Sequence, residues 1–296
     1  SSSSLIEASV TMRARSLDST LQTVVLDFDP NNGNLSVNSV DQGPDTASLS
    51  HTVNTANNWL IIQLPAPVPA GSEFQVRVSY SGTPRQNYSG GLATTYRRTT
   101  HGPGNFPVIY TASQPYGARR WWPCKDLPDD KATTTIQRIR VPAGYEVVSN
   151  GRLASKITNP DSSVTWVWEN SYPISTYLVS FATSNYVYST ATYTALDGVT
   201  TMAISHAIYP ENVPYEGNGA QGTLQVLNLF ANLFGEYPFL REKYATASWN
   251  ISFGIEHQTC TGMPGANQGS FTDGSVGNGL TRRNIHELAH HWYGDS

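Results

Sequence analysis

The sequence has 296 residues, a formal net charge of −4 and charged side chains at 14% of its positions. This length suits two domains and is enough to bury a sizeable core. The weak negative charge excludes a basic surface that grips nucleic acid, and no apolar run is long enough for a membrane-spanning helix.

Lysine is scarce in the sequence, and small polar residues are abundant. This composition is common in exported β-rich proteins, so we expect a secreted or periplasmic protein. The two cysteines, Cys124 and Cys260, allow one intramolecular pair. The sequence leaves open whether they form a disulfide or remain two separate thiols.

The first 190 residues predict β-structure. Short runs rich in Val, Thr and Tyr alternate apolar and polar positions between turn-forming residues, most clearly at 24–28, 74–80, 136–141 and 164–168. Many short strands at such spacing predict a sandwich or saddle of antiparallel sheets. We place this N-terminal antiparallel β domain at residues 1–187.

The pattern changes in the last third of the chain. Apolar residues within 217–235 recur at i, i+3 and i+4, which predicts an amphipathic helix. The glycine-rich segment 262–279 predicts a loop, and a second helix carries residues 285–293. Because the sequence stops soon after this helix, we expect the second domain, residues 188–296, to be truncated.

The second predicted helix carries the residues of a metal site. His286 and His290 are four residues apart, so both imidazoles lie on one helical face, where zinc takes such nitrogens at about 2.0–2.1 Å. Glu287 lies beside this face and can take a proton from a zinc-bound water and deliver it to a leaving amine. His291 lies about 100° around the helix and is expected to be a packing or rim residue. A surface helix that carries two histidines by chance is the alternative.

The segment His286–Asp295, HELAHHWYGD, resembles the zinc helix of the M1 zinc aminopeptidases, gluzincins of the aminopeptidase N and leukotriene A4 hydrolase type. Thirty residues before the first zinc histidine, Phe253–His257 resembles the exopeptidase motif of this family, with Ile255 in place of Met and His257 in place of Asn. The resemblance implies that the Glu256 carboxylate binds the free α-amino group of the substrate. On its own, Glu256 reads as an ordinary acid at a strand edge.

The resemblance assigns further substrate contacts. Gly254 and Ile255 belong to the same exopeptidase motif and are expected to bind substrate beside Glu256. Residues 114–128 resemble the family's segment that leads from the β domain into the active-site floor, which implies that Gln114 holds the same amine by a hydrogen bond. The residues alone leave a solvated glutamine open.

The arginine pair of the same segment has two readings. The resemblance implies that Arg119 and Arg120 brace the fold, because the family does not use them chemically. Their sequence equally suits an anion site.

The resemblance also implies the fold. Residues 174–181 resemble the last strand of the family's N-terminal saddle, and residues 234–239 resemble the helix exit before the edge strand of its catalytic domain. The expected fold is a mainly β saddle or sandwich domain followed by a truncated thermolysin-like α+β catalytic domain.

Two groups implied by the resemblance lie outside the sequence. A third zinc ligand, a glutamate, is expected about eighteen residues past His290, and a tyrosine that stabilises the oxyanion is expected further downstream. Both positions fall beyond residue 296. We therefore expect residues 1–296 alone to bind zinc weakly and to hydrolyse little.

Together these features predict a zinc-dependent aminopeptidase that acts on peptides with a free N-terminus. An endopeptidase with the same helix is one alternative, and such an enzyme has no need of Glu256 as an amine anchor. A non-catalytic binding module on the same scaffold is another, and the β-rich first domain suits it. Epoxide hydrolysis is a third, suggested by Gln114 alone. The sequence leaves the preferred first residue and the oligomeric state open.

Overall fold

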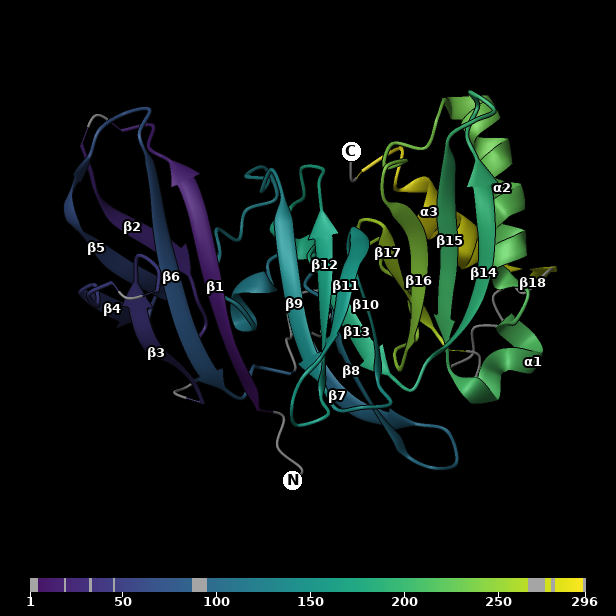
Figure 1. Cartoon of the computed structure of the whole chain (residues 1–296), viewed down its shortest axis with the longest axis horizontal. Coiled ribbons are helices and arrows are strands. Elements are labelled where there is room, and N and C mark those ends of the chain that lie inside the picture. The colour runs from purple at the N-terminus through teal and green to yellow at the C-terminus, as the bar shows by residue number, and fades with distance from the viewer. Residues whose placement is uncertain are drawn as a thin grey trace. The chain divides into compact units, whose positions relative to one another are not determined.

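The computed structural model describes residues 5–18, 20–31, 34–44, 46–86, 95–265, 275–277 and 280–294. Most of its regular structure is β, as the alternating runs predict (Figure 1). The chain forms two compact units. Unit 1 is Ser1–Tyr96 with Ser113–Asp130, and unit 2 is Arg97–Ala112 with Lys131–Ser296. Residues 131–187 thus group with the later chain, and the predicted domain boundary at residue 187 stays a prediction.

Unit 1 contains two three-stranded antiparallel sheets, with the orders β1-β6-β3 and β2-β5-β4. Alternate side chains of β1 are half-buried and exposed, as a strand with one solvated face requires. Both sheets contribute to one core, which includes Leu26, Ile62 and Tyr80. The strands are β1 (Ile6–Arg15), β2 (Leu21–Asp27), β3 (Leu35–Asp41), β4 (His51–Asn54), β5 (Trp59–Val68) and β6 (Glu73–Gly82).

Ion pairs of Arg119 hold residues 113–130 within unit 1. The Arg119 guanidinium lies 2.9 Å from a carboxylate oxygen of Asp27 and 2.9 Å from one of Asp126. Arg120 is buried, with Nε 3.7 Å from the Asp29 carboxylate. These ion pairs give the arginines the structural role that the resemblance implies.

Unit 2 contains three larger sheets with the orders β10-β13-β8-β7, β11-β12-β9 and β14-β15-β16-β17, and a short β18-β19 pair. The strands are β7 (Tyr96–His101), β8 (Phe106–Thr111), β9 (Thr135–Val141), β10 (Glu146–Ser149), β11 (Arg152–Thr158), β12 (Val164–Asn170), β13 (Phe181–Ser184), β14 (Val187–Thr194), β15 (Thr201–Ile208), β16 (Lys243–Trp249), β17 (Cys260–Pro264), β18 (Ser275–Gly277) and β19 (Leu280–Thr281).

The β14-β15-β16-β17 sheet carries the helices. β15, β16 and β17 run parallel, and α2 lies in the crossover from β15 to β16, because parallel neighbours need a long connection. Leu227 and Ala231 of α2 share a buried cluster with Leu288 of α3 and with Tyr244 of β16. This cluster fixes the face that α3 turns toward the sheet.

The described part of the chain has three helices: α1 (Val213–Glu216), α2 (Gly219–Phe234) and α3 (Arg282–Ala289). α2 confirms the helix predicted within 217–235. α3 confirms the second helix but ends at Ala289, so residues 290–294 form turns instead of the predicted helical extension. None of the helices combines the length and apolar character needed to cross a bilayer.

Three local predictions were wrong. Cys260–Pro264 is a fully buried strand and Ser275–Gly277 a short one, so the segment 262–279 is not wholly a loop; residues 266–274 and 278–279 lie outside the described residues. Residues 176–178 form a 3₁₀ turn, and β13 begins only at Phe181. β16, which follows residues 234–239, lies inside its sheet and not at the edge.

Candidate metal centre

The helix α3 begins at a reciprocal cap. The Thr281 hydroxyl oxygen accepts a hydrogen bond from the Asn284 backbone N–H at 3.4 Å, and the Asn284 side-chain oxygen accepts one from the Thr281 backbone N–H at 2.8 Å. This capping box satisfies two backbone donors at the first turn. Leu288 is buried against α2. The cap and the buried leucine fix where the helix begins and which face stays free.

His286 and His290 lie on that free face. Their Nε2 atoms are 3.2 Å apart, and their rings are nearly perpendicular, with an interplanar angle of 85°. Two nitrogens that each lie 2.0–2.1 Å from a tetrahedral zinc ion are separated by about 3.3 Å. The observed separation therefore fits one zinc ion held by both imidazoles.

The backbone beside His290 favours the tautomer that binds metal. The Nδ1 atom of His290 lies 3.3 Å from the Tyr293 carbonyl oxygen. A proton on Nδ1 donates to this carbonyl and leaves the Nε2 lone pair for the metal, which is the usual arrangement around ligating histidines.

Glu287 lies next to the histidine pair and is buried. Burial and, to a smaller extent, the neighbouring Glu256 charge together raise the pKa of Glu287 from its ordinary value of 4.5 to about 7, against the opposing effect of Arg283. A carboxylate with a pKa near neutrality can both take and return a proton under physiological conditions. His286, Glu287 and His290 form the only group of three His, Cys, Asp or Glu side chains, within the described residues, that could hold a metal ion.

The predicted exopeptidase segment lies against this carboxylate. A Cβ atom added to Gly254 would be 2.5 Å from the Oε1 atom of Glu287. Real Cβ atoms do not approach so closely, so a larger residue at position 254 would push the Glu287 side chain out of this position. The structure thus places Gly254 against Glu287, and Glu256 lies close enough for its charge to act on the same carboxylate; their joint role in binding substrate stays a prediction.

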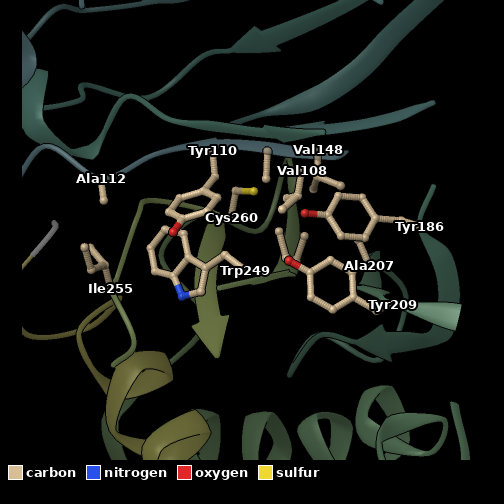
Figure 2. Close-up of a cluster of buried hydrophobic side chains, with 13 residues drawn as sticks. Val108, Tyr110, Ala112, Val148, Tyr186, Ala207, Tyr209, Trp249, Ile255 and Cys260 are labelled. Atoms are coloured by element: carbon tan, nitrogen blue, oxygen red, sulfur yellow. The ribbon is translucent and has the colours of Figure 1, made fainter. Parts of the chain in front are cut away.

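Ile255 anchors the segment to the core. Its backbone N–H and C=O both pair with Gly262, with N···O distances of 3.0 and 2.9 Å. Figure 2 shows its side chain in a buried cluster that also contains Tyr110, Trp249 and Cys260. Glu256 follows directly and is itself buried. Ile255 is therefore a packing residue in this structure, and contact of its backbone with substrate stays a prediction.

His291 is fully buried behind the metal helix, which agrees with the packing alternative and not with a rim position. Its Nδ1 lies 2.8 Å from the Tyr237 hydroxyl and its Nε2 lies 3.4 Å from the Thr261 hydroxyl. Burial and, to a smaller extent, the neighbouring His290 and Lys243 together lower the pKa of His291 to about 3. The neutral ring joins the end of α3 to β17 and to the turn before β16.

Gln114, Asp295 and the two cysteines were also singled out in the sequence. Gln114 belongs to unit 1 and is joined to Pro115 by a cis peptide bond, so its contribution to amine binding rests on the sequence alone. Asp295 lies outside the described residues. Cys124 of unit 1 and Cys260 of unit 2 are each a free, buried thiol.

The sequence noted His257 only as a departure from the exopeptidase motif and gave Lys243 no role. The Nε2 atom of His257 is buried and has no hydrogen-bond partner among the described residues. Lys243 is buried within β16. The available signal for Lys243 was a lone lysine at the start of an otherwise uncharged strand.

The sequence of this chain is similar to those of several known proteins. A family model described as the peptidase M1 N-terminal domain matches residues 2–178. Endoplasmic reticulum aminopeptidase 1 of Rattus norvegicus is 24% identical over 250 residues, which cover 81% of this chain and 26% of that protein. Glutamyl aminopeptidase of Homo sapiens is 38% identical over 95 residues, which cover 32% of this chain and 10% of that protein.

A solved structure shares the fold. The M1 zinc metallopeptidase from Deinococcus radiodurans superposes with a TM-score of 0.74 at 23% identity, covering 98% of this chain and 60% of that one. The chain spans about a quarter of the length of endoplasmic reticulum aminopeptidase 1. Because the family model matches more than half of the sequence, the chain belongs to the M1 family of peptidases.

Proposed function

We propose that this protein is a zinc-dependent aminopeptidase that removes N-terminal residues from peptides. The observation that carries the proposal is the pair of Nε2 atoms 3.2 Å apart, with the buried carboxylate of Glu287, whose pKa is raised, beside them and a second buried carboxylate, Glu256. Membership of the M1 family supports a peptidase, and this geometry supports the specific chemistry.

In the proposed mechanism, His286 and His290 hold the zinc ion. Zinc bound there acts as a Lewis acid that polarises the scissile carbonyl and lowers the pKa of water to about 7. Glu287 removes a proton from the attacking water and returns it to the leaving amine. Its buried position beside the histidines and its pKa near 7 suit both steps.

Glu256 is proposed to select the N-terminus of the substrate. A buried carboxylate attracts a cationic group, and the α-ammonium group at the N-terminus of a peptide is such a group. Gly254 and Gln114 complete the proposed substrate contacts. An endopeptidase has no use for this second acid, so the burial of Glu256 beside Glu287 favours an exopeptidase. Secretion stays a proposal that rests on the scarcity of lysine and the abundance of small polar residues.

The test uses the natural protein that contains this chain. Cleavage of an aminoacyl 4-nitroanilide is compared with that of its N-acetylated form, in the unaltered protein and in the Glu256→Gln variant. We expect the unaltered protein to prefer the free amine and the variant to lose most of this preference. Glu169→Gln, which removes a carboxylate paired with Arg152 on the neighbouring strand, is the matched control. Equal cleavage of both substrates by the unaltered protein would point to an endopeptidase, and no cleavage of either would point to a binding module.

A further inference from the structure

Lys243 is a buried lysine, whereas the other three lysines of the chain are exposed. Its Nζ donates hydrogen bonds to the carbonyl oxygens of Ser149, at 2.7 Å, and Thr259, at 2.9 Å, and it lies 4.8 Å from the centre of the Trp168 ring. Burial lowers the pKa of Lys243 to about 8. A buried ammonium group is costly to desolvate, and in this position it joins two carbonyl groups from separate parts of the chain.

Thr259 is held in a strained conformation by these contacts. Its φ angle of 58° lies in the left-handed region, which is unfavourable for a β-branched residue. Its carbonyl accepts hydrogen bonds from Lys243 Nζ and, at 3.1 Å, from the Ala245 backbone N–H, and its hydroxyl accepts one from the Gly151 backbone N–H at 2.8 Å. Such a conformation persists only where surrounding contacts determine it.

The preceding residue, Gln258, is held in the same way. Its carbonyl oxygen accepts a hydrogen bond from the Asn150 side chain at 2.6 Å, and its own side chain donates to the Asn170 side-chain oxygen at 3.2 Å. Gln258 and Thr259 are both fully buried. The chain immediately after Glu256 is therefore fixed by β16, by the end of β12 and by the turn between β10 and β11.

Glu256 lies between two fixed points of the backbone. On one side, Ile255 pairs with Gly262; on the other, the Cys260 N–H donates to the His257 carbonyl in a tight turn, with an N···O distance of 2.9 Å. A shift of Thr259 must therefore be transmitted to Glu256 through this short closed loop.

We propose that Lys243 is a positioning residue that holds the loop 256–261 so that the Glu256 carboxylate meets the substrate amine. This inference rests on the proposed role of Glu256. A lysine serves where an apolar residue cannot, because its ammonium group has three donors and bonds to Ser149 and Thr259 at once. Loss of these bonds frees a strained segment and misplaces the carboxylate.

The test measures how much the substrate amine contributes to binding. The zinc-loaded natural protein containing this chain is titrated with leucine hydroxamate and with its des-amino analogue, 4-methylpentanoyl hydroxamate. The ratio of the two dissociation constants reports the amine contact. In the Lys243→Met variant we expect this ratio to fall by about tenfold, since small misplacements of a positioned group cost one to two orders of magnitude. Affinity for the des-amino compound should stay nearly unchanged, which a general loss of structure would not produce.

Two further variants make the result decisive. Lys156→Met is the matched control, since Lys156 also lies over a tryptophan ring and pairs with Glu146, and its ratio should equal that of the unaltered protein. Thr259→Val, which removes the hydroxyl that accepts from the Gly151 N–H and that also interacts with the Glu242 carboxylate, should lower the ratio as well, and it is the variant measured if Lys243→Met does not fold.

Each outcome bears on one claim. An unchanged ratio in folded Lys243→Met, or in Thr259→Val if Lys243→Met does not fold, overturns the positioning role. If Glu256→Gln also leaves the ratio unchanged, the proposed amine contact is wrong, and the inference fails with it. If the unaltered protein binds neither hydroxamate, the proposed metal site is wrong, and again the inference fails.

Discussion

The pKa of Glu287 is set by the groups that surround its carboxylate. Its carboxylate is buried against the Gly254 backbone. Glu256 is a neighbour of like charge, and the positive charge of Arg283 partly offsets its effect on the pKa of Glu287. Burial and the like charge both disfavour the ionised form. The same surroundings that suit a general base therefore destabilise the metal-free fold.

This cost predicts a pH-dependent effect of Glu287→Gln on metal-free protein. The folded-state pKa of Glu287, about 7, lies above its ordinary value of 4.5, so the folded state binds more protons between these values and its stability falls as pH rises through them. Removing the carboxyl should have little effect near pH 4 and should stabilise the protein by up to about 3 kcal/mol above pH 7. Urea unfolding across this range measures the difference, and a difference that does not vary with pH would contradict the assignment.

The residues of the metal helix were predictable because helical periodicity alone places His286 and His290 on one face. The need for Gly254 became clear only from its distance to Glu287. The lone lysine at position 243 is visible in the sequence, but its role could not be predicted, because its partners are carbonyl groups at positions 149 and 259 that only the tertiary fold brings together. Backbone acceptors carry no signature in a sequence.

At the scale of elements, the end of α3 is held by a buried polar contact as well as by Leu288. The His291 ring stacks against Tyr237, with centroids 5.7 Å apart, and the Tyr237 hydroxyl lies 2.8 Å from its Nδ1. This contact joins the last turn after α3 to the connection between α2 and β16. It holds the helix end from which His290 projects.

A double-mutant cycle with His291→Phe and Tyr237→Phe tests this link. Tyr237→Phe removes the hydroxyl beside His291 Nδ1, and His291→Phe leaves the Tyr237 hydroxyl with the longer bond to the Lys243 carbonyl, at 3.3 Å. Each change should therefore cost about 1–3 kcal/mol of unfolding free energy, and the two should couple by about 1 kcal/mol. The control pairs His291→Phe with Tyr186→Phe, whose hydroxyl bonds to the Ser248 carbonyl instead, and should be additive. Additivity of the first pair in urea unfolding would show that the contact does not stabilise the helix end.

Element prediction succeeded where periodicity was strong and failed where composition misled. α2 and the strands β2, β6, β9 and β12 follow their apolar patterns. The glycine-rich stretch after Cys260 suggested a loop, but the strand β17 begins there. A Cβ added to Gly262 would be 2.1 Å from the Trp249 ring, so this glycine permits close packing inside a sheet rather than a flexible turn.

At the scale of the whole molecule, the two compact units do not follow the linear order of the chain. Residues 97–112 belong to unit 2, although they interrupt unit 1, because β8 pairs with β13 more than seventy residues later. The sequence predicted a single boundary near residue 187, because local patterns do not show which distant strands pair. The mainly β character, which depends on local alternation, was predicted correctly.

The central claim is that His286 and His290 bind one zinc ion, and zinc titration of the purified 296-residue chain tests it most directly. At saturating zinc we predict one ion per chain in the unaltered protein, in Glu287→Gln and in the control His51→Ala, which removes an exposed histidine of unit 1. His286→Ala and His290→Ala should each abolish this binding while far-ultraviolet circular dichroism stays unchanged. Undiminished zinc binding by either of these two variants, or none by the unaltered chain, would contradict the account.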